Sequence, residues 1–222
     1  MSAKVLWIRH GESEANAGLP TPDVWSTPLT AAGWEQARAI AAGMDLRPRL
    51  IVHSCMERAR QTARAAAERW PGARLEEWPV QEFTFLSGAA YAHTTQEQRD
   101  EGVRRYWERM DPDGCDGPGA ESFAGFIGRV DETLARLRGV VGRAPGDGPV
   151  CVFTHGRFIR GVLLRVREFA SQGGCGAMQC AVAPADEPME VVMRRALQMM
   201  TAVSVPNGVV WEMELGLSLI HI

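Results

Sequence analysis

The sequence predicts an α/β fold, a three-layer sandwich with a mostly parallel, mixed central sheet flanked by helices. Three observations lead to this prediction. Short apolar runs, such as residues 5–8 and 150–153, are bounded by glycine or polar residues, as in the buried strands of parallel sheets. Between these runs, apolar residues recur at the spacing of a helix. The alternation of the two patterns is typical of a parallel sheet that carries helices on both faces.

The first half of the chain follows this alternation closely. Thr30 is a residue type that caps helices, and it ends a polar loop that runs from about Gly11 to Leu29. The expected order is a strand at 5–8, a helix from Thr30 to about Met44, a strand at 50–53, a helix that ends before Pro71, and a short strand at 75–78.

The second half begins with a long amphipathic helix whose apolar face carries Phe123, Phe126, Ile127, Val130, Leu134, Leu137 and Val141. After it we expect a strand at 150–153, a helix through Phe158, and another helix over 187–200. Two final strands, at 202–205 and 209–215, are joined by the turn residues Pro206-Asn207-Gly208. They predict an antiparallel hairpin, which makes the sheet mixed.

Residues 83–119 interrupt the alternation. They contain a turn-rich run at 111–119 together with several arginines and aromatic residues. We interpret them as an insertion that folds over one edge of a single domain, residues 1–216, as a lid on the substrate side. Residues 217–222 resemble the translation of a sequencing-adaptor fragment, so we expect them to be non-native and the natural C-terminus to be missing.

Composition argues against several classes of protein. The formal net charge of −3 is not that of a non-specific nucleic-acid binder, which is normally basic. No apolar stretch is long enough to cross a membrane, and the N-terminus lacks the apolar core of a signal peptide. Five scattered cysteines without a Cys-x-x-Cys pair are typical of reduced thiols in a cytoplasmic protein. We expect no nucleic-acid or membrane partner, and the oligomeric state stays open, with a homodimer as one alternative.

Two similar motifs stand where two of the expected strands end. They are Arg9-His10-Gly11-Glu12 and Thr154-His155-Gly156-Arg157. In open α/β sheets, ligands bind in the crevice outside the carboxyl ends of the strands. A lone histidine at such a position more often caps a helix or bonds a carbonyl group. Two strand-end histidine–glycine pairs in one chain are a much more specific signal.

The residue types in these motifs suit the binding of phosphate. A guanidinium such as that of Arg9 matches phosphate oxygens with two parallel hydrogen bonds. A neutral imidazole at His10 is available as a nucleophile near neutral pH. His155 would donate a hydrogen bond to a phosphoryl oxygen as charge builds there, and Gly156 would let the backbone approach the ligand closely.

Two further residues are candidates for the same site. On the helix after the second strand, Arg58 and Arg60 point about 200° apart, so only one of them faces the cleft. Nearness to the helix start favours Arg58. Glu82 is the candidate proton donor for a leaving alkoxide. The alternative for both residues is an ordinary solvated side chain, because most arginines and glutamates lie on the protein surface.

Four ordered motifs together resemble the histidine phosphatase superfamily, the phosphoglycerate-mutase-like group. They are Arg9-His10-Gly11-Glu12 with Asn16, Arg58-Ala59-x-Gln61-Thr62-Ala63, Gly119-Ala120-Glu121-Ser122-Phe123 and Thr154-His155-Gly156. The resemblance implies a phosphohistidine intermediate on His10 and a phosphate pocket of Arg9, Arg58 and His155, assisted by Asn16. It implies Glu82 as the acid and base, and no metal or other cofactor.

The chain departs from the family pattern at two places. Cys55-Met56-Glu57 replaces the proline and leucine often found before the arginine of the second motif. The residues after Glu82 lack the aromatic–glycine pair that often follows the acid. The pattern of the glycolytic mutases is therefore not reproduced, and the substrate stays open.

These observations predict a metal-independent phosphomonoester hydrolase that acts on a small phosphorylated substrate through a phosphohistidine. The nearest alternative is a phosphoglycerate-type phosphomutase. A non-catalytic phosphate-binding module and a metal-binding protein using His10 and His155 are alternatives of other classes. Within the insertion, a solvated helix with a packed aromatic pair is one interpretation. The other is that some of its residues contact the leaving group, the candidates being Arg99, Arg104, Arg105, Tyr106 and Trp107.

Overall fold

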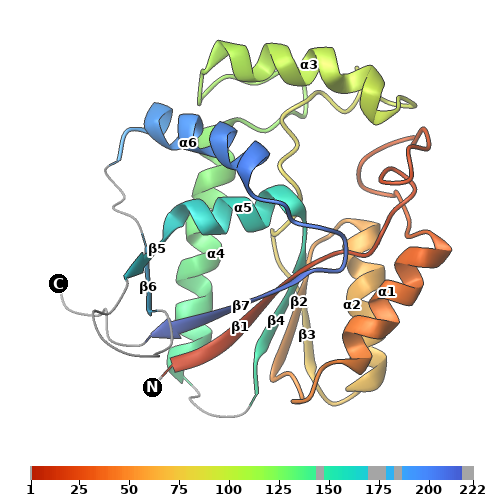
Figure 1. Cartoon of the computed structure of the whole chain (residues 1–222), viewed down its shortest axis with the longest axis vertical. Helices are drawn as coiled ribbons and strands as arrows, with labels where there is room; N and C mark the ends of the chain where they lie inside the picture. Colours follow the sequence, from red (N-terminus) through yellow and green to blue (C-terminus); the bar gives the residue numbers. More distant parts are fainter. Residues whose placement is uncertain (1, 144–147, 170–178, 183–186, 217–222) are drawn as a thin grey trace.

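The computed structural model describes residues 2–143, 148–169, 179–182 and 187–216 (Figure 1). Five strands form the central sheet in the order β3-β2-β4-β1-β7. Their bounds are β1 Ser2–Arg9, β2 Leu50–His53, β3 Arg74–Glu77, β4 Val150–Thr154 and β7 Val210–Gly216. The first four strands run parallel, and β7 pairs antiparallel with β1. The predicted mostly parallel, mixed sheet is confirmed. The suspected tail at 217–222 lies outside the described residues.

Helices cover both faces of the sheet and one of its edges (Figure 1). One face carries α1 Ala31–Ala42 and α2 Glu57–Arg69, and the other carries α4 Phe123–Arg143, α5 Gly156–Arg165 and α6 Met189–Ala202. The remaining helix, α3 Gln96–Arg109, lies beyond the carboxyl ends of the parallel strands. A separate antiparallel pair, β5 Val166–Phe169 and β6 Gln179–Val182, was not predicted.

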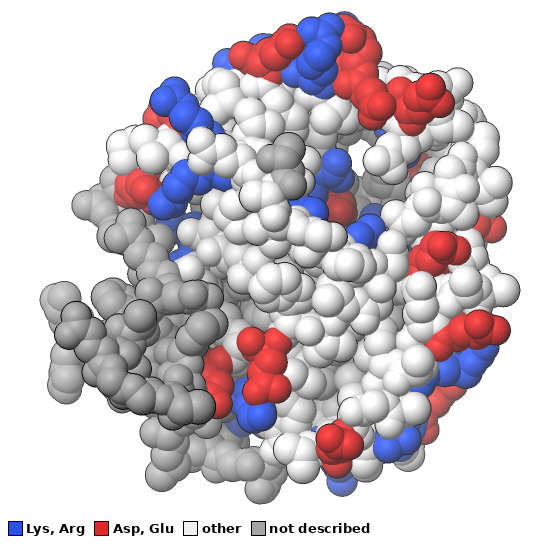
Figure 2. Space-filling view, viewed as in Figure 1, with Lys and Arg blue, Asp and Glu red and all other residues white. Residues whose placement is uncertain are grey.

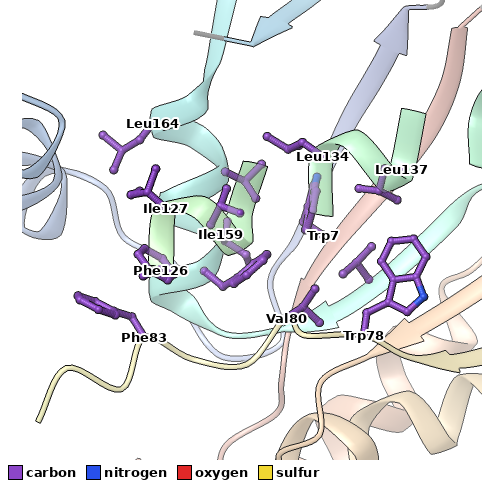
Figure 3. Packing of buried hydrophobic residues seen from close by; sticks show 14 of the residues in the cluster. Trp7, Trp78, Val80, Phe83, Phe126, Ile127, Leu134, Leu137, Ile159 and Leu164 are labelled. Carbon is purple, nitrogen blue, oxygen red and sulfur yellow. The ribbon is translucent and has the colours of Figure 1, made fainter. Parts of the chain in front are cut away.

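The inner strands β1, β2 and β4 are largely buried because their residues alternate between two apolar cores. Trp7 of β1 and Val152 of β4 point toward α4 and α5, whereas Ile8 and Phe153 point toward α1 and α2. The first core is shown in Figure 3, where side chains of α4 and α5 pack over the sheet. All seven residues of the apolar face predicted for α4 are buried. This double coverage leaves the carboxyl edge of the sheet as the open place for a ligand.

The predicted helix start at Thr30 is confirmed. Its side chain accepts a hydrogen bond from the backbone N–H of Gly33, which satisfies one of the free donors of the first turn. The Thr30 hydroxyl also donates to the carboxylate of Glu12 at 2.7 Å. The cap therefore ties the start of α1 to the loop that leaves β1.

The predicted hairpin between 202–205 and 209–215 is wrong. Ala202 ends α6, residues 203–206 form no strand, and β7 finds its partner in β1. The physical reason is that the carbonyl groups of this segment bind arginine side chains instead of a neighbouring strand. Val203 accepts from Arg160, and Val205 accepts from Arg9.

The insertion at 83–119 is anchored by aromatic packing. Phe83, Phe85, Tyr106 and Trp107 are all buried and join the same core as Phe123. Of the two interpretations, the packed aromatic pair is therefore correct for Tyr106 and Trp107, whose ring centroids lie 5.5 Å apart. Their rings hold α3 over the edge of the sheet, so they do not face a substrate.

A close backbone contact fixes the loop after β1 against α1. A Cβ atom on Gly33 would lie 2.0 Å from the carbonyl oxygen of Glu12, a contact that the backbone must move to relieve. We expect Gly33→Ala to lower the free energy of unfolding by about 1–3 kcal/mol, the usual range for overpacking. Urea unfolding measures this effect.

Gly128 is the matched control, because it lies exposed within α4 and nothing approaches its missing Cβ within 4 Å. Alanine favours a helix over glycine by about 1 kcal/mol, so Gly128→Ala is expected to stabilise the protein. A Gly33→Ala protein as stable as the wild type would show that the loop contact carries no strain.

Candidate active site

The two strand-end histidines lie side by side, with their ring planes tilted by 58°. Arg9 and Thr154 are register partners in the parallel pair β1–β4, so the next residue of each strand emerges at the same edge of the sheet. The ring centroids of His10 and His155 are 5.0 Å apart. Both rings are buried, with 2% and 0% of their surfaces exposed. Two distant parts of the sequence thus form one pocket.

Hydrogen bonds orient the His10 ring. Its Nδ1 lies 2.7 Å from the carbonyl oxygen of Gly11, and its Nε2 accepts from Nε of Arg58 at 3.2 Å. A carbonyl oxygen can only accept and a guanidinium can only donate, so the proton belongs on Nδ1 and the lone pair on Nε2. This directs the lone pair of His10 toward Arg58.

Arg58 points into the pocket, as the helical geometry predicted. It is buried at 8% exposure, whereas Arg60 is exposed and pairs with Glu57. The Arg58 Nη1 group donates to the carbonyl oxygen of Val24 at 2.6 Å. No carboxylate among the described residues bonds this guanidinium, which leaves its charge available to an anion.

The His155 ring bonds a residue that the sequence analysis did not single out. Its Nε2 lies 2.9 Å from Oγ of Ser54, and that oxygen accepts from the backbone N–H of Met56. The other ring nitrogen of His155, Nδ1, is buried and has no partner among the described residues. A buried polar atom without a partner costs free energy, and in the tautomer that carries its proton on Nδ1 the ring would donate to a phosphoryl oxygen.

Glu82 is held against the start of α5. Its Oε1 accepts from the backbone N–H groups of Arg157 at 3.0 Å and Phe83 at 3.2 Å. Its Oε2 lies 3.9 Å from Nη1 of Arg157. Figure 2 shows a hollow beneath α3 that contains both basic and acidic side chains. The carboxylate of Glu82 is thus brought from the insertion side to the histidine pocket.

Arg9 and Asn16, the two remaining candidates, both bond residues of the segment that follows α6. Arg9 donates from Nη1 to the carbonyl group of Val205, and its buried Nε has no partner among the described residues. Nε of Arg9 is 3.6 Å from the position that a Cβ of Gly156 would take, so this glycine keeps the space beside Arg9 open. The Asn16 side-chain oxygen accepts from Ser13 and from Asn207.

Asn207 is a second residue that the sequence analysis assigned only to a turn. Its Nδ2 donates to the carbonyl groups of His10 at 3.2 Å and Gly11 at 3.3 Å, and to Oδ1 of Asn16 at 3.0 Å. It fixes the backbone of the His10 loop from a distant part of the chain. The position of Ser54, directly after β2, was a signal that could have found that residue. Asn207 carried no comparable signal.

Burial and neighbouring positive charge both lower the pKa values of His10 and His155. Burial, and next the charge of Arg58, lowers the pKa of His10 well below its ordinary value, and the same two causes lower the pKa of His155. Burial also lowers the pKa of the Arg58 guanidinium to about 10. At neutral pH the pocket therefore presents neutral imidazoles beside charged guanidinium groups.

These lowered pKa values predict how stability depends on pH. Below about pH 6.5, histidines of the unfolded chain take up protons that His10 and His155 in the native protein do not. The free energy of unfolding should then fall between pH 7 and 5.5, by about 1 kcal/mol for each histidine that stays neutral. Urea unfolding at the two pH values measures it. His155→Asn removes one such group, so an equally steep fall in that variant would contradict the assignment.

Fold and site together define a class of protein, an α/β sheet whose carboxyl edge brings two buried histidines together beside arginine side chains. The chain belongs to the histidine phosphatase superfamily (branch 1), whose family model matches residues 5–174. The resemblance noted in the sequence is thereby confirmed.

Solved structures share the fold over nearly the whole chain. A mycobacterial glucosyl-3-phosphoglycerate phosphatase in complex with VO3 is 22% identical with a TM-score of 0.66, over 95% of this chain and 90% of that one. A putative alpha-ribazole-5′-P phosphatase from Escherichia coli is 21% identical with a TM-score of 0.66, over 96% and 91%. A phosphoserine phosphatase mutant from Entamoeba histolytica in complex with phosphoserine is 19% identical with a TM-score of 0.61, over 95% and 89%. No curated protein matches the chain.

Among the residues that the structure describes, no helix is long and apolar enough to cross a membrane. Among the same residues, no three His, Cys, Asp or Glu side chains gather in a group that could hold a metal ion.

Proposed function

We propose that this protein is a phosphatase that hydrolyses small phosphomonoesters through a phosphohistidine on His10, without a metal or other cofactor. The observation that carries the proposal is the pair of adjacent neutral imidazoles with Arg58 beside the Nε2 lone pair of His10. A nucleophile must be unprotonated to attack, and burial keeps it so even below its ordinary pKa. The proposed substrate-binding groups are Arg9, Arg58, Asn16 and Gly156.

In the first step, Nε2 of His10 attacks phosphorus while the ester P–O bond breaks. Charge spreads over the three equatorial oxygens, where Arg9, Arg58 and, with its proton on Nδ1, His155 would stabilise it. Arg58, which donates to Nε2 in the free protein, would turn its donors to the phosphate oxygens.

Glu82 supplies the proton that the leaving oxygen needs. Its carboxyl group is held at the start of α5, next to His155, where it would transfer that proton in the first step. In the second step the Glu82 carboxylate takes a proton from water, whose oxygen attacks phosphorus as the P–N bond breaks. His10 is restored and inorganic phosphate leaves.

The proposal is tested with a panel of phosphomonoesters. Phosphate and the free alcohol are expected in equal amounts, and rapid quenching should trap an acid-labile phosphoryl group on His10, located by mass spectrometry. An isomerised phosphoester without phosphate release would indicate a phosphomutase. Tight phosphate binding without any phosphoenzyme would indicate a non-catalytic module. A cytoplasmic location is proposed only from the scattered cysteines.

A further inference from the structure

The motif at residues 119–123 has no role in the two chemical steps proposed above, yet one of its side chains bonds a nearly buried charge. Two residues of the motif serve the start of α4. The Ser122 hydroxyl accepts a backbone N–H of the first turn at 3.1 Å, and Phe123 is buried in the core. Glu121 instead bonds Arg129, which lies on α4. We call these two residues the Glu121–Arg129 clamp.

The two side chains of the clamp form a bidentate ion pair. Nε of Arg129 donates to Oε1 of Glu121 at 2.9 Å, and its Nη2 donates to Oε2 at 2.7 Å. The guanidinium also lies 5.5 Å from the ring centroid of Phe126 and 5.3 Å from that of Phe158. A bidentate pair fixes the direction of a guanidinium as well as compensating its charge. Arg129 is therefore held in one orientation.

The remaining donors of Arg129 reach the segment that leads into the proposed acid. Its Nη1 donates to the carbonyl oxygens of Pro79 at 2.9 Å and Gln81 at 2.8 Å. The carbonyl oxygen between them, that of Val80, accepts from the Thr154 hydroxyl at 2.5 Å. This segment lies outside the helices and strands. Side chains thus take the place of the strand partner that would otherwise satisfy these carbonyl groups.

Glu121 also holds the chain on the other side of the acid. Its backbone N–H donates to the carbonyl oxygen of Thr84 at 2.9 Å. Between the two anchored points lies Glu82, whose Oε1 accepts from the start of α5 at 3.0 Å. Figure 3 shows that Val80 and Phe83, on either side of Glu82, belong to the buried core. A shift of this segment would therefore move the carboxyl group of Glu82.

We propose that the Glu121–Arg129 clamp positions the carboxyl group of Glu82 for proton transfer to the leaving oxygen. Both members are positioning residues, because they act through Glu82 and not on the substrate. The inference deepens the proposed function and rests on it, since Glu82 is the proposed acid and base. A proton passes efficiently only between atoms within hydrogen-bond reach, and a misplacement of about 1 Å can cost about 100-fold in rate.

The test replaces Arg129 with lysine. Lysine keeps the positive charge beside Glu121, but its three donors on one nitrogen cannot bond the four oxygens that Arg129 bonds. Arg165→Lys is the matched control. The Arg165 side chain is 4% exposed, against 10% for Arg129, and its Nε bonds a carboxylate of α4, that of Asp131, at 2.7 Å. It is the last residue of α5, at the opposite end from Glu82.

The readout is the rate of the first step in single turnovers with propyl phosphate and with p-nitrophenyl phosphate. The propyl alkoxide needs the proton from Glu82, whereas p-nitrophenolate leaves without it. Arg129→Lys is expected to change the ratio of the two rates by about tenfold or more, at the expense of propyl phosphate. Arg165→Lys should leave the ratio within about threefold. A smaller fraction of folded protein lowers both rates equally and does not change their ratio.

A double substitution shows whether the clamp acts through the acid. When Glu82→Gln is already present, adding Arg129→Lys should change the ratio by less than about threefold, because no proton donor is left to misplace. If Arg129→Lys does not fold, Glu121→Gln tests the same clamp. It removes the negative charge and one acceptor from Arg129, and the same change of ratio is expected.

An unchanged ratio in the clamp variants, or an equally large change in the presence of Glu82→Gln, would overturn the inference. So would a comparable change in Arg165→Lys. In each of these cases phosphate release and phosphohistidine trapping with the wild-type protein would still support the proposed function. If the wild-type protein released phosphate from neither ester, both proposals would fail.

Discussion

Replacing His10 with alanine is expected to lower kcat/KM for phosphomonoester hydrolysis by about 10⁴-fold or more, the scale of losing an essential nucleophile. The Nε2 lone pair of His10 is the only one that the structure directs at Arg58 among the described histidines. Nε2 of His155 is bonded instead to the hydroxyl group of Ser54. Initial rates with a phosphomonoester measure the effect, and no phosphoryl group should be trapped on the variant.

His53 provides a matched control for this substitution. It is also a buried strand-end histidine, and its Nδ1 bonds the carbonyl group of the next residue, Ser54, at 2.9 Å. His53→Ala should lose comparable packing and hydrogen bonding yet retain activity within about tenfold. If His10→Ala keeps wild-type turnover, or if His53→Ala is equally inactive, the assignment of His10 as the nucleophile is wrong.

Glu82→Gln is expected to reduce kcat by about 10²- to 10⁴-fold, with a size that depends on the leaving group. The amide keeps an oxygen for the backbone N–H groups of Phe83 and Arg157 but cannot transfer a proton. An alkyl phosphate needs that proton in the first step and should be hydrolysed very slowly. p-Nitrophenolate leaves without help, so stopped-flow measurements should show a burst of about one equivalent before slow hydrolysis.

Glu76→Gln is the control, because the side chain of Glu76 is 18% exposed and that of Glu82 is 17% exposed. Glu76 lies on the edge strand β3 and pairs with Arg74 of the same strand and with Arg136 of α4. Removing its charge should therefore affect the stability of the protein rather than the burst. If Glu82→Gln lowers the rate equally for the alkyl phosphate and for p-nitrophenyl phosphate, and no burst appears, then Glu82 only positions the start of α5.

The order of strands and helices, and the burial of the predicted face of α4, followed from the sequence because periodicity is a local property. So did the meeting of the strand-end histidines, since parallel strands deliver their carboxyl ends to one edge. The helical angle between Arg58 and Arg60, together with the nearness of Arg58 to the helix start, was equally sufficient to choose the buried arginine. These arguments needed only local patterns and the general rule for parallel strands.

Local periodicity could not predict that β7 pairs antiparallel with β1, or that residues 203–206 form no strand. An apolar segment next to a turn is typical of one strand of a hairpin. In the structure β7 pairs with β1 instead, and the carbonyl groups of residues 203 and 205 accept hydrogen bonds from Arg160 and Arg9. The aromatic residues of the insertion were similarly ambiguous. Packing against the main core, not local pattern, decided that Tyr106 and Trp107 face inward.

By itself, the sequence determined the family, the layered architecture and the main anion-binding candidates, because these depend on short motifs and on repeating spacings. Only the tertiary structure decided which groups those candidates meet: Ser54 at His155, Asn207 at the His10 loop, and Arg157 at Glu82. Such contacts join residues that are distant in the chain. Their energies depend on burial and on distances between charges, and folding alone sets both.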